Sequence, residues 1–282
     1  MKFLLSALVC LTVYSVSFAQ DKTGDSSKTQ NTSTFKASLT YLSNAVYNGR
    51  KDSLALPYVT PSLGYFDKSG FYISASASYL ANASSRFDLF TLETGYDLTI
   101  SDQVSASFYA EKYFYNKNST SVKSEMKGGM GASLSYDPGL ITLNGGVDLS
   151  FSSQTDVFTN LSLGHAFYLG ADDQQWSITP TVTANAGSQK YYQAYKKSAR
   201  IIKRSGVSGG NVYVVGADKF VLLDYEFSVP ITYDAKKWEL HFTPTYALPE
   251  NPISLTRPNG AVLVKEKLEN TFYAELGVYV KF

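Results

Sequence analysis

The strongest constraint in this sequence is an alternation of apolar and polar residues that begins at Thr34 and continues to the last residue. Its clearest example is the segment 271–282, in which Phe272, Leu276 and Val278 share one parity while Glu275 and Lys281 share the other. Successive side chains of a β-strand point to opposite faces. The pattern therefore predicts strands with one apolar face and one polar face.

The alternation rule divides the chain into about twelve such segments. Their approximate spans are 34–48, 54–66, 71–81, 86–100, 104–116, 124–137, 140–153, 156–170, 176–190, 218–234, 237–249 and 271–282. Most are longer than the roughly 5–6 residues usual in globular sheets, and they reach the roughly 9–11 residues that a tilted strand needs to cross a bilayer. We expect an all-β fold, an antiparallel transmembrane β-barrel of about 12 strands over residues 34–282, with ten or fourteen strands as alternatives.

Successive connections between these segments lie at opposite ends of the predicted barrel, and the connections at the two ends differ in length. Every second connection is short and rich in turn residues: 67–70, 101–103, 137–139, 171–174 and 234–236. The two longest connections, 191–217 and 250–270, both fall on the other parity. We expect short periplasmic turns and two long extracellular loops, with both ends of the barrel chain on the periplasmic side.

Composition supports a membrane location and excludes some partners. Charged residues make up 17% of the chain, the mean hydropathy is -0.13 and the net charge is +1. Nucleic-acid-binding proteins usually carry a basic face, and disordered chains a high net charge. We therefore expect no nucleic-acid partner, and we attribute the low charge to a large area facing lipid and the 22 Tyr to the interfaces and the lumen wall.

The N-terminus reads as a targeting segment. Residues 1–19 have a positive start at Lys2, an apolar stretch and small residues at Ser17 and Ala19, which predicts a signal peptide. Residues 20–33 lack bulky apolar side chains and form a flexible polar leader. The only cysteine, Cys10, lies within the signal peptide, so a mature chain would contain no disulfide.

These features resemble the Gram-negative outer-membrane β-barrel class. The resemblance rests on the signal peptide, the alternating strands and the terminal run 278–282, which ends in an aromatic residue. It implies a bacterial outer-membrane location, contact with outer-membrane lipids and lipopolysaccharide, and recognition of Phe282 by the barrel-assembly machinery. Early motifs, 41–44 and Asn48-Gly49-Arg50, resemble barrels from Bacteroidetes. A soluble periplasmic sandwich also alternates, but long strands and a terminal Phe favour the barrel.

The polar face of the predicted strands is mainly acidic. Its acidic members are Glu93, Asp97, Glu111, Asp148, Asp224, Glu226, Glu239 and Glu275, accompanied by the basic Lys36, Lys127 and Lys281 and by His241. Charges on a low-dielectric wall bias which ions enter, so these residues are candidates for lining a lumen. The alternative, of equal weight, is that they pair with one another and fill a narrow barrel. Small residues such as Gly129 and Gly131 leave space and mildly favour a water-filled path.

The loop 191–217 carries a cluster of basic residues and no acidic one. The cluster consists of Lys196, Lys197, Arg200, Lys203 and Arg204. We consider three interpretations: the loop folds into the mouth and constricts the pore, it binds lipopolysaccharide phosphates, or it is a solvated charge run.

Enzyme chemistry has little support in the sequence. There are two histidines, no nucleophile elbow, no cysteine ligand and no metal-site spacing, so we expect no catalytic residue, no metal and no cofactor. The expected function is a passive, porin-like channel for small polar solutes or ions with an acidic lumen. The alternatives are a non-conducting structural or surface-interaction barrel and, third, a lipid-modifying outer-membrane enzyme. The oligomeric state is left open.

Overall fold

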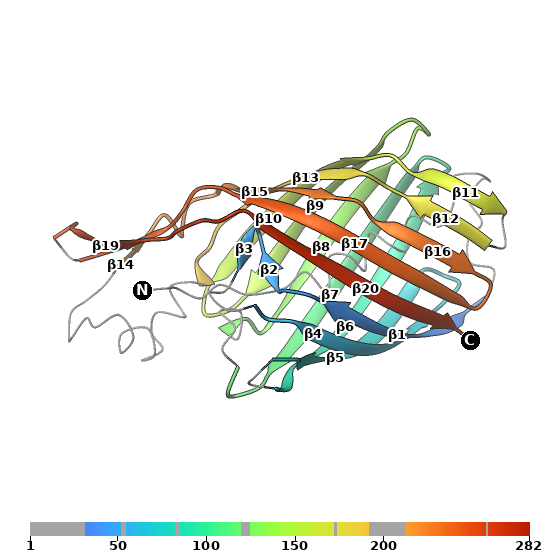
Figure 1. Ribbon diagram of the computed structural model, residues 1–282, viewed down its shortest axis with the longest axis horizontal. Coiled ribbons are helices and arrows are strands. Elements are labelled where there is room, and N and C mark those ends of the chain that lie inside the picture. Colours follow the sequence, from blue (N-terminus) through green and yellow to red (C-terminus); the bar gives the residue numbers. More distant parts are fainter. Residues whose placement is uncertain are drawn as a thin grey trace.

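Twelve long antiparallel strands close into one barrel in this computed structural model, which describes residues 32–51, 55–82, 85–119, 125–171, 174–191, 213–257 and 259–282 (Figure 1). Three of the long strands are interrupted and carry two labels each. In chain order the strands are β1 (Thr34–Leu42), β4 (Tyr58–Phe66), β5 (Phe71–Leu80), β6 (Arg86–Ser101), β7 (Val104–Tyr115), β8 (Gly128–Tyr136), β9 (Thr142–Phe151), β10 (Thr155–Gly164) with β11 (Phe167–Ala171), β12 (Gln174–Ile178) with β13 (Thr181–Gly187), β15 (Val221–Ser228) with β16 (Ile231–Ala235), β17 (Trp238–Pro249) and β20 (Thr271–Lys281). The predicted fold class and strand number are confirmed.

The first and last strands pair with each other and close the ring. Strand β1 runs antiparallel to β20 from Lys36 opposite Lys281 to Leu42 opposite Glu275. The amide of Phe282 continues this ladder by donating to the carbonyl of Phe35. Because each barrel strand has a neighbour on both sides, the sheet has no free edge, which is the condition for a sheet to cross hydrocarbon.

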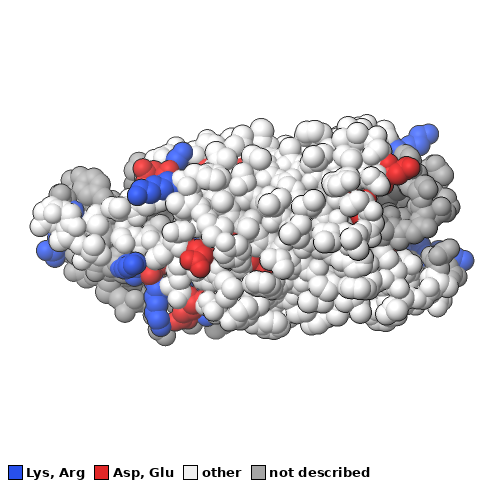
Figure 2. Space-filling view, turned by 90° about the horizontal axis from the view of Figure 1, so that it is seen from above, with Lys and Arg blue, Asp and Glu red and all other residues white. Residues whose placement is uncertain are grey.

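The outer face is apolar and the inner face is mostly polar, as the alternation predicts. Leu63, Phe108 and Leu276 are 58%, 50% and 53% exposed, whereas Glu93 and Glu275 are 7% and 6% exposed. Charged side chains gather towards the two ends of the molecule and leave a wide uncharged zone between them (Figure 2). This distribution fits a protein whose middle section contacts lipid.

Aromatic rings lie near the strand ends on the outside. The ring of Tyr233 lies between Trp176 and Trp238, with ring centroids 4.7 and 5.3 Å apart. Such rings suit the bilayer interface. Phe66 and Tyr72 instead stack on each other at 5.6 Å, and Tyr72 is only 7% exposed, on the inside of the barrel.

Tight turns form the barrel end that carries Thr34 and Phe282, here called the turn end. In the connection 67–70 the Asp67 carboxylate accepts bonds from the amide of Ser69 and the hydroxyls of Ser33 and Tyr65. Bonds from Ser69, then Ser33 and Tyr65, hold the pKa of Asp67 well below its usual range. Gly70 has φ +98°, and a Cβ there would lie 2.1 Å from the carbonyl oxygen of Asp97, so only glycine fits this turn.

The opposite end, here called the loop end, contains structure that the alternation did not predict. Strands β14 (Tyr213–Val215), β18 (Ser254–Thr256) and β19 (Val262–Lys265) form a small sheet that extends beyond the barrel (Figure 1). Strands β2 (Val46–Tyr47) and β3 (Arg50–Lys51) form a hairpin, here called the inner hairpin (residues 46–51). The predicted strand 34–48 is therefore wrong at its end, because β1 stops at Leu42 and the chain turns inward.

The predicted signal peptide 1–19 and most of the leader 20–33 lie outside the described residues, and both stay predictions. Within the described residues, no helix has the length and apolar character needed to span a membrane.

A charge on the outer face tests whether that face contacts hydrocarbon. We expect Leu276→Arg, in the middle of β20, to lower the free energy of unfolding in lipid vesicles by about 2–4 kcal/mol, the cost of Arg at the bilayer midplane. Leu140→Arg, in the connection between β8 and β9, is the control and should cost less than about 1 kcal/mol. Equal losses at the two positions would contradict a lipid-facing Leu276.

Candidate functional site: the barrel interior

The structure places most of the predicted lumen residues on inward positions of the barrel strands. These are Glu93 and Asp97 on β6, Glu111 on β7, Asp148 on β9, Asp224 and Glu226 on β15, Glu239 and His241 on β17, and Glu275 on β20. All are buried or half-buried, whereas their apolar strand neighbours are exposed. Lys127 differs, because it precedes β8 at the loop end and its side chain is exposed.

Tyrosine hydroxyls donate to many of these carboxylates. The pairs are Tyr72 to Glu93 (2.8 Å), Tyr109 to Asp148 (2.6 Å), Tyr273 to Glu226 (3.0 Å), Tyr58 to Asp88 (2.8 Å) and Tyr113 to Glu111. A hydrogen bond from a hydroxyl to an ionised carboxylate is stronger than a bond between two neutral groups. Such a bond therefore stabilises the charged form of the carboxylate. Much of the inner wall therefore consists of acid–tyrosine pairs, which spread the negative charge without neutralising it.

Inward glycines make room for these rings and not for water. A Cβ at Gly131 would lie 2.3 Å from Asp148 Oδ1 and 2.4 Å from the Tyr109 ring. A Cβ at Gly95 would lie 2.4 Å from the Tyr72 ring. The inference from small residues to open space was therefore wrong at Gly131, because large side chains on adjacent strands occupy the space there.

A mixed charge cluster lies inside the turn end. Lys281 Nζ is 3.3 Å from Asp234 and 3.4 Å from Glu239, and Glu239 also pairs with His241 Nε2. The other ring nitrogen of His241 is 3.3 Å from the Thr232 hydroxyl. These side chains are 12–34% exposed, so they are within reach of solvent.

Glu275 has no such partner. It is 6% exposed, and no hydrogen bond or ion pair reaches its carboxylate from the described residues. Across the sheet it faces Leu42 on β1 and Thr243 on β17. A buried carboxylate without a partner loses its hydration without compensation.

The inner hairpin crosses the lumen at the loop end. Asn48 and Gly49 both have positive φ (47° and 72°), the geometry of a two-residue turn that Asn-Gly favours. The ring of Tyr47 reaches Phe158 on β10, a strand nearly opposite β1 in the ring, with centroids 5.6 Å apart. The ideal Cβ position of Gly49 lies only 2.7 Å from Asp224 Cβ, so the turn presses against β15, three strands from β1 around the ring.

Arg50 holds the hairpin in place. Its side chain is 1% exposed, and its guanidinium donates to the carbonyls of Asn48 (3.0 Å), Leu223 (3.2 Å), Glu250 (2.8 Å) and Asn251 (3.0 Å). Its Nε lies 3.4 Å from Glu266 Oε1. The neighbouring Lys51 lies in a more exposed pair with Glu269, whose pKa is lowered, mainly by the bond from Lys267 and then by Lys51.

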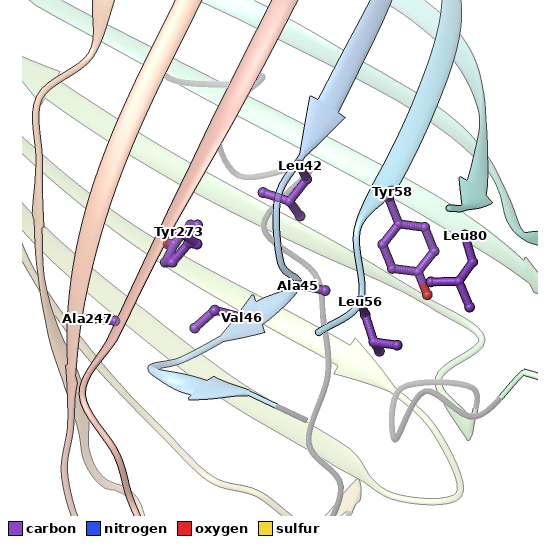
Figure 3. Close-up of a cluster of buried hydrophobic side chains, with 8 residues drawn as sticks. All are labelled: Leu42, Ala45, Val46, Leu56, Tyr58, Leu80, Ala247 and Tyr273. Carbon is purple, nitrogen blue, oxygen red and sulfur yellow. The ribbon is translucent and has the colours of Figure 1, made fainter. Parts of the chain in front are cut away.

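Two apolar clusters fill the loop end around the hairpin. One, shown in Figure 3, joins hairpin residues to the barrel wall: Leu42, Ala45, Val46, Leu56, Tyr58, Leu80, Ala247 and Tyr273. The other consists of Tyr113, Met126, Phe158, Tyr191, Ala217, Leu223 and Ile253. At this end apolar side chains share the inward face with buried carboxylates, so the expectation of a polar inner face is met only in part here.

The loop residues proposed as a constriction, Lys196, Lys197, Arg200, Lys203 and Arg204, lie outside the described residues. Sequence analysis missed Arg50, although the Asn48-Gly49 dipeptide before it is a strong hairpin signal. It also missed two buried carboxylates at the loop end. Asp88 accepts bonds from Arg86 and Ser119, and Asp156 accepts bonds from Ser188 and two backbone amides of residues 190–191.

No group of three or more His, Cys, Asp or Glu side chains among the described residues is arranged to hold a metal ion. The Thr232 hydroxyl oxygen lies 3.3 Å from Nδ1 of His241, a distance at the long end of the hydrogen-bonding range.

No protein-family model and no curated protein sequence matches the chain. Solved structures with a related shape include an outer-membrane channel from Pseudomonas putida F1 (12% identity, TM-score 0.46, 93% of this chain and 100% of that chain) and LpxR from Salmonella typhimurium (9%, 0.46, 88% and 100%). OccAB4 of Acinetobacter baumannii is 11% identical, with a TM-score of 0.31 over 91% of this chain and 100% of that chain. At these values the likenesses carry no argument about function.

The deciding observation is the closed ring with an apolar exterior and a charged interior. The chain is an outer-membrane β-barrel protein. Its candidate functional site is the lumen, which is acidic along the wall and contains the inner hairpin at the loop end.

Glu275 offers a test of the unpartnered carboxylate. We expect Glu275→Gln to raise the free energy of unfolding by about 1–3 kcal/mol, because an amide loses less on burial than an unpaired charge. The measurement is urea unfolding in lipid vesicles at about pH 8, where a free carboxyl is ionised. Glu93→Gln is the control, since Glu93 accepts the Tyr72 bond, and it should give no gain. A loss of stability in Glu275→Gln would show that Glu275 has a partner.

Proposed function

We propose that the protein is a passive outer-membrane channel for small cations and small polar solutes, closed at its loop end by the inner hairpin. The observation that carries the proposal is the excess of acidic over basic side chains on the inner wall. Three basic residues of the barrel strands lie on that wall: Lys36 and Lys281 near the turn end, and Arg86 at the start of β6, where it pairs with Asp88 at 2.9 Å. Fixed negative charge on a low-dielectric wall lowers the energy of a cation and raises that of an anion.

Passage requires the inner hairpin to move. Val46 of the hairpin and Ala45 just before it are fully buried among wall side chains, and Arg50 bonds to the carbonyl of Leu223 on β15. Hydrogen bonds to a charged group contribute roughly 1.5–3 kcal/mol each, so Arg50 is the largest single polar restraint on the hairpin. A channel of this kind would conduct only in the fraction of time during which these contacts are broken.

A second candidate function is a non-conducting barrel that acts through its loop-end surface. The packed apolar clusters around the hairpin favour it, because they leave the loop end without a polar path. Conductance separates the two candidates, since only the channel passes current when the hairpin is released.

The proposal assigns no catalytic step to the interior. The His241 ring pairs with Glu239 and packs edge-on against Tyr279 at 4.8 Å, which is the setting of a structural histidine. We also propose that Phe282, 74% exposed at the end of the closing ladder, is the residue that the barrel-assembly machinery recognises.

Removing the Arg50 side chain should release the hairpin. We expect Arg50→Ala to raise open probability in planar bilayers at least about tenfold, because breaking a charged hydrogen-bond group removes more than 1.4 kcal/mol. Lys51→Ala is the matched control, since Lys51 is the neighbouring cation but has an exposed pair, and it should conduct as the parent does. Silence of both variants at every voltage would favour the non-conducting barrel.

The wall charge should set ion preference. In an Arg50→Ala background under a KCl gradient, we expect a reversal potential on the cation-selective side, and a smaller one in Asp148→Asn. Asp137→Asn, in the turn between β8 and β9, removes the same charge outside the lumen and should leave the potential unchanged. Anion selectivity of the Arg50→Ala channel would contradict the proposed acidic path.

A further inference from the structure

Among the described residues, Asp224 is the most deeply buried carboxyl group without a hydrogen bond of accepted geometry. It is 0% exposed, and neither carboxylate oxygen has a hydrogen-bond partner among the described residues. Its side chain points inward from β15 beneath the turn of the inner hairpin, where the ideal Cβ position of Gly49 is 3.0 Å from Asp224 Oδ2. An ionised group buried in this way needs an opposite charge close to it.

Oxygen atoms surround this carboxylate. Glu226 lies two residues along the same strand and on the same face, and Asn185 lies directly opposite on β13. Both side chains lie within hydrogen-bonding reach of Asp224, although neither contact has the full geometry of a hydrogen bond. Tyr273 places its hydroxyl 3.0 Å from Glu226 Oε1. The group thus offers two carboxylates and one hydroxyl oxygen, with the Asn185 amide beside them.

Arg50 does not neutralise this group. It is a neighbour of Asp224, but its Nη1 and Nη2 are committed to four backbone carbonyls and its Nε faces Glu266. One guanidinium therefore faces three carboxylates, those of Asp224, Glu226 and Glu266. Counted over the described residues, the balance of charge around the hairpin turn is negative.

We infer that the space between the Asp224 and Glu226 carboxylates binds a small hard cation of the calcium type. Oxygen-only ligands are those that Ca²⁺ prefers, and its flexible coordination accepts amide and hydroxyl oxygens and water alongside carboxylates. Two carboxylates are fewer than a tight calcium site uses, so binding is weak and exchangeable. The inference goes beyond the proposed channel, because equilibrium binding needs no conduction.

The test uses Tb³⁺, a calcium substitute that emits when a nearby tyrosine is excited. The full-length protein, refolded in detergent micelles, is titrated with Tb³⁺ while tyrosine is excited, and the bound ion is then displaced with Ca²⁺. We expect saturable emission that Ca²⁺ removes. Asp224→Asn and Glu226→Gln each keep the shape and remove one charge, and each should weaken binding at least about tenfold, because affinity follows the number of charged ligands.

Asp148→Asn is the matched control. It removes a lumen carboxylate that has its own donor in Tyr109, and it should bind Tb³⁺ as the parent does. If Asp224→Asn does not fold, Glu226→Gln decides the question. The inference is overturned if the parent shows no saturable, Ca²⁺-displaceable emission, or if both carboxamide variants bind as tightly as the parent.

Binding and conduction fail independently. If the protein binds Tb³⁺ at Asp224 but Arg50→Ala passes no current in bilayers, the inferred cation site stands and the proposed channel is contradicted. If the protein conducts cations but shows no saturable Tb³⁺ emission, the proposed channel stands and the inferred cation site is contradicted.

Discussion

The backbone hydrogen-bond requirement of the bilayer dominates this structure. Hydrocarbon offers no partner for a peptide group, so a spanning sheet is stable only when its first and last strands pair. The β1–β20 ladder meets this requirement, and it brings Thr34 and Phe282 to one end. Closure also fixes which parity of every strand faces lipid, because a one-residue slip would move a complete set of charges outward. The apolar exterior and the acidic interior are therefore two consequences of one ring.

A narrow ring then has to fill its own interior. The acid–tyrosine pairs do so at modest cost, since each phenol supplies bulk and a donor at once. They also require glycine at facing positions: Tyr72 lies over Gly95, and Tyr109 over Gly131. High tyrosine content, small inward residues and few basic residues are thus parts of one packing solution. The wall stays negative because tyrosine stabilises a carboxylate without cancelling its charge.

Sequence periodicity predicted the barrel because lipid exposure is imposed position by position along each strand. It placed Glu93, Asp148 and Glu275 on the inner face for the same reason. It could not predict the inner hairpin, because Arg50 is held by backbone carbonyls at Leu223 and Glu250, and a carbonyl has no residue-type signature. Periodicity also could not show that the Tyr109 ring fills the space beside Gly131, because that contact depends on the register between β7 and β8. Local signals such as Asn48-Gly49 predict a turn, but they do not predict the direction in which the turn points.

Arg50, which holds the hairpin in the lumen, and Asp224, which belongs to the proposed cation site, are neighbours. A direct bond between them would strengthen the first role and weaken the second. The hairpin brings a guanidinium into the acidic lumen, which favours the closed state electrostatically, yet its donors bond to carbonyls and leave Asp224 without a direct partner. A bidentate Arg–Asp pair would hold the hairpin more firmly and would also remove the negative charge that attracts a cation. With the charge left uncompensated, the closed barrel keeps a negative potential behind its plug. A wall with this arrangement can hold a cation next to the element that blocks its path.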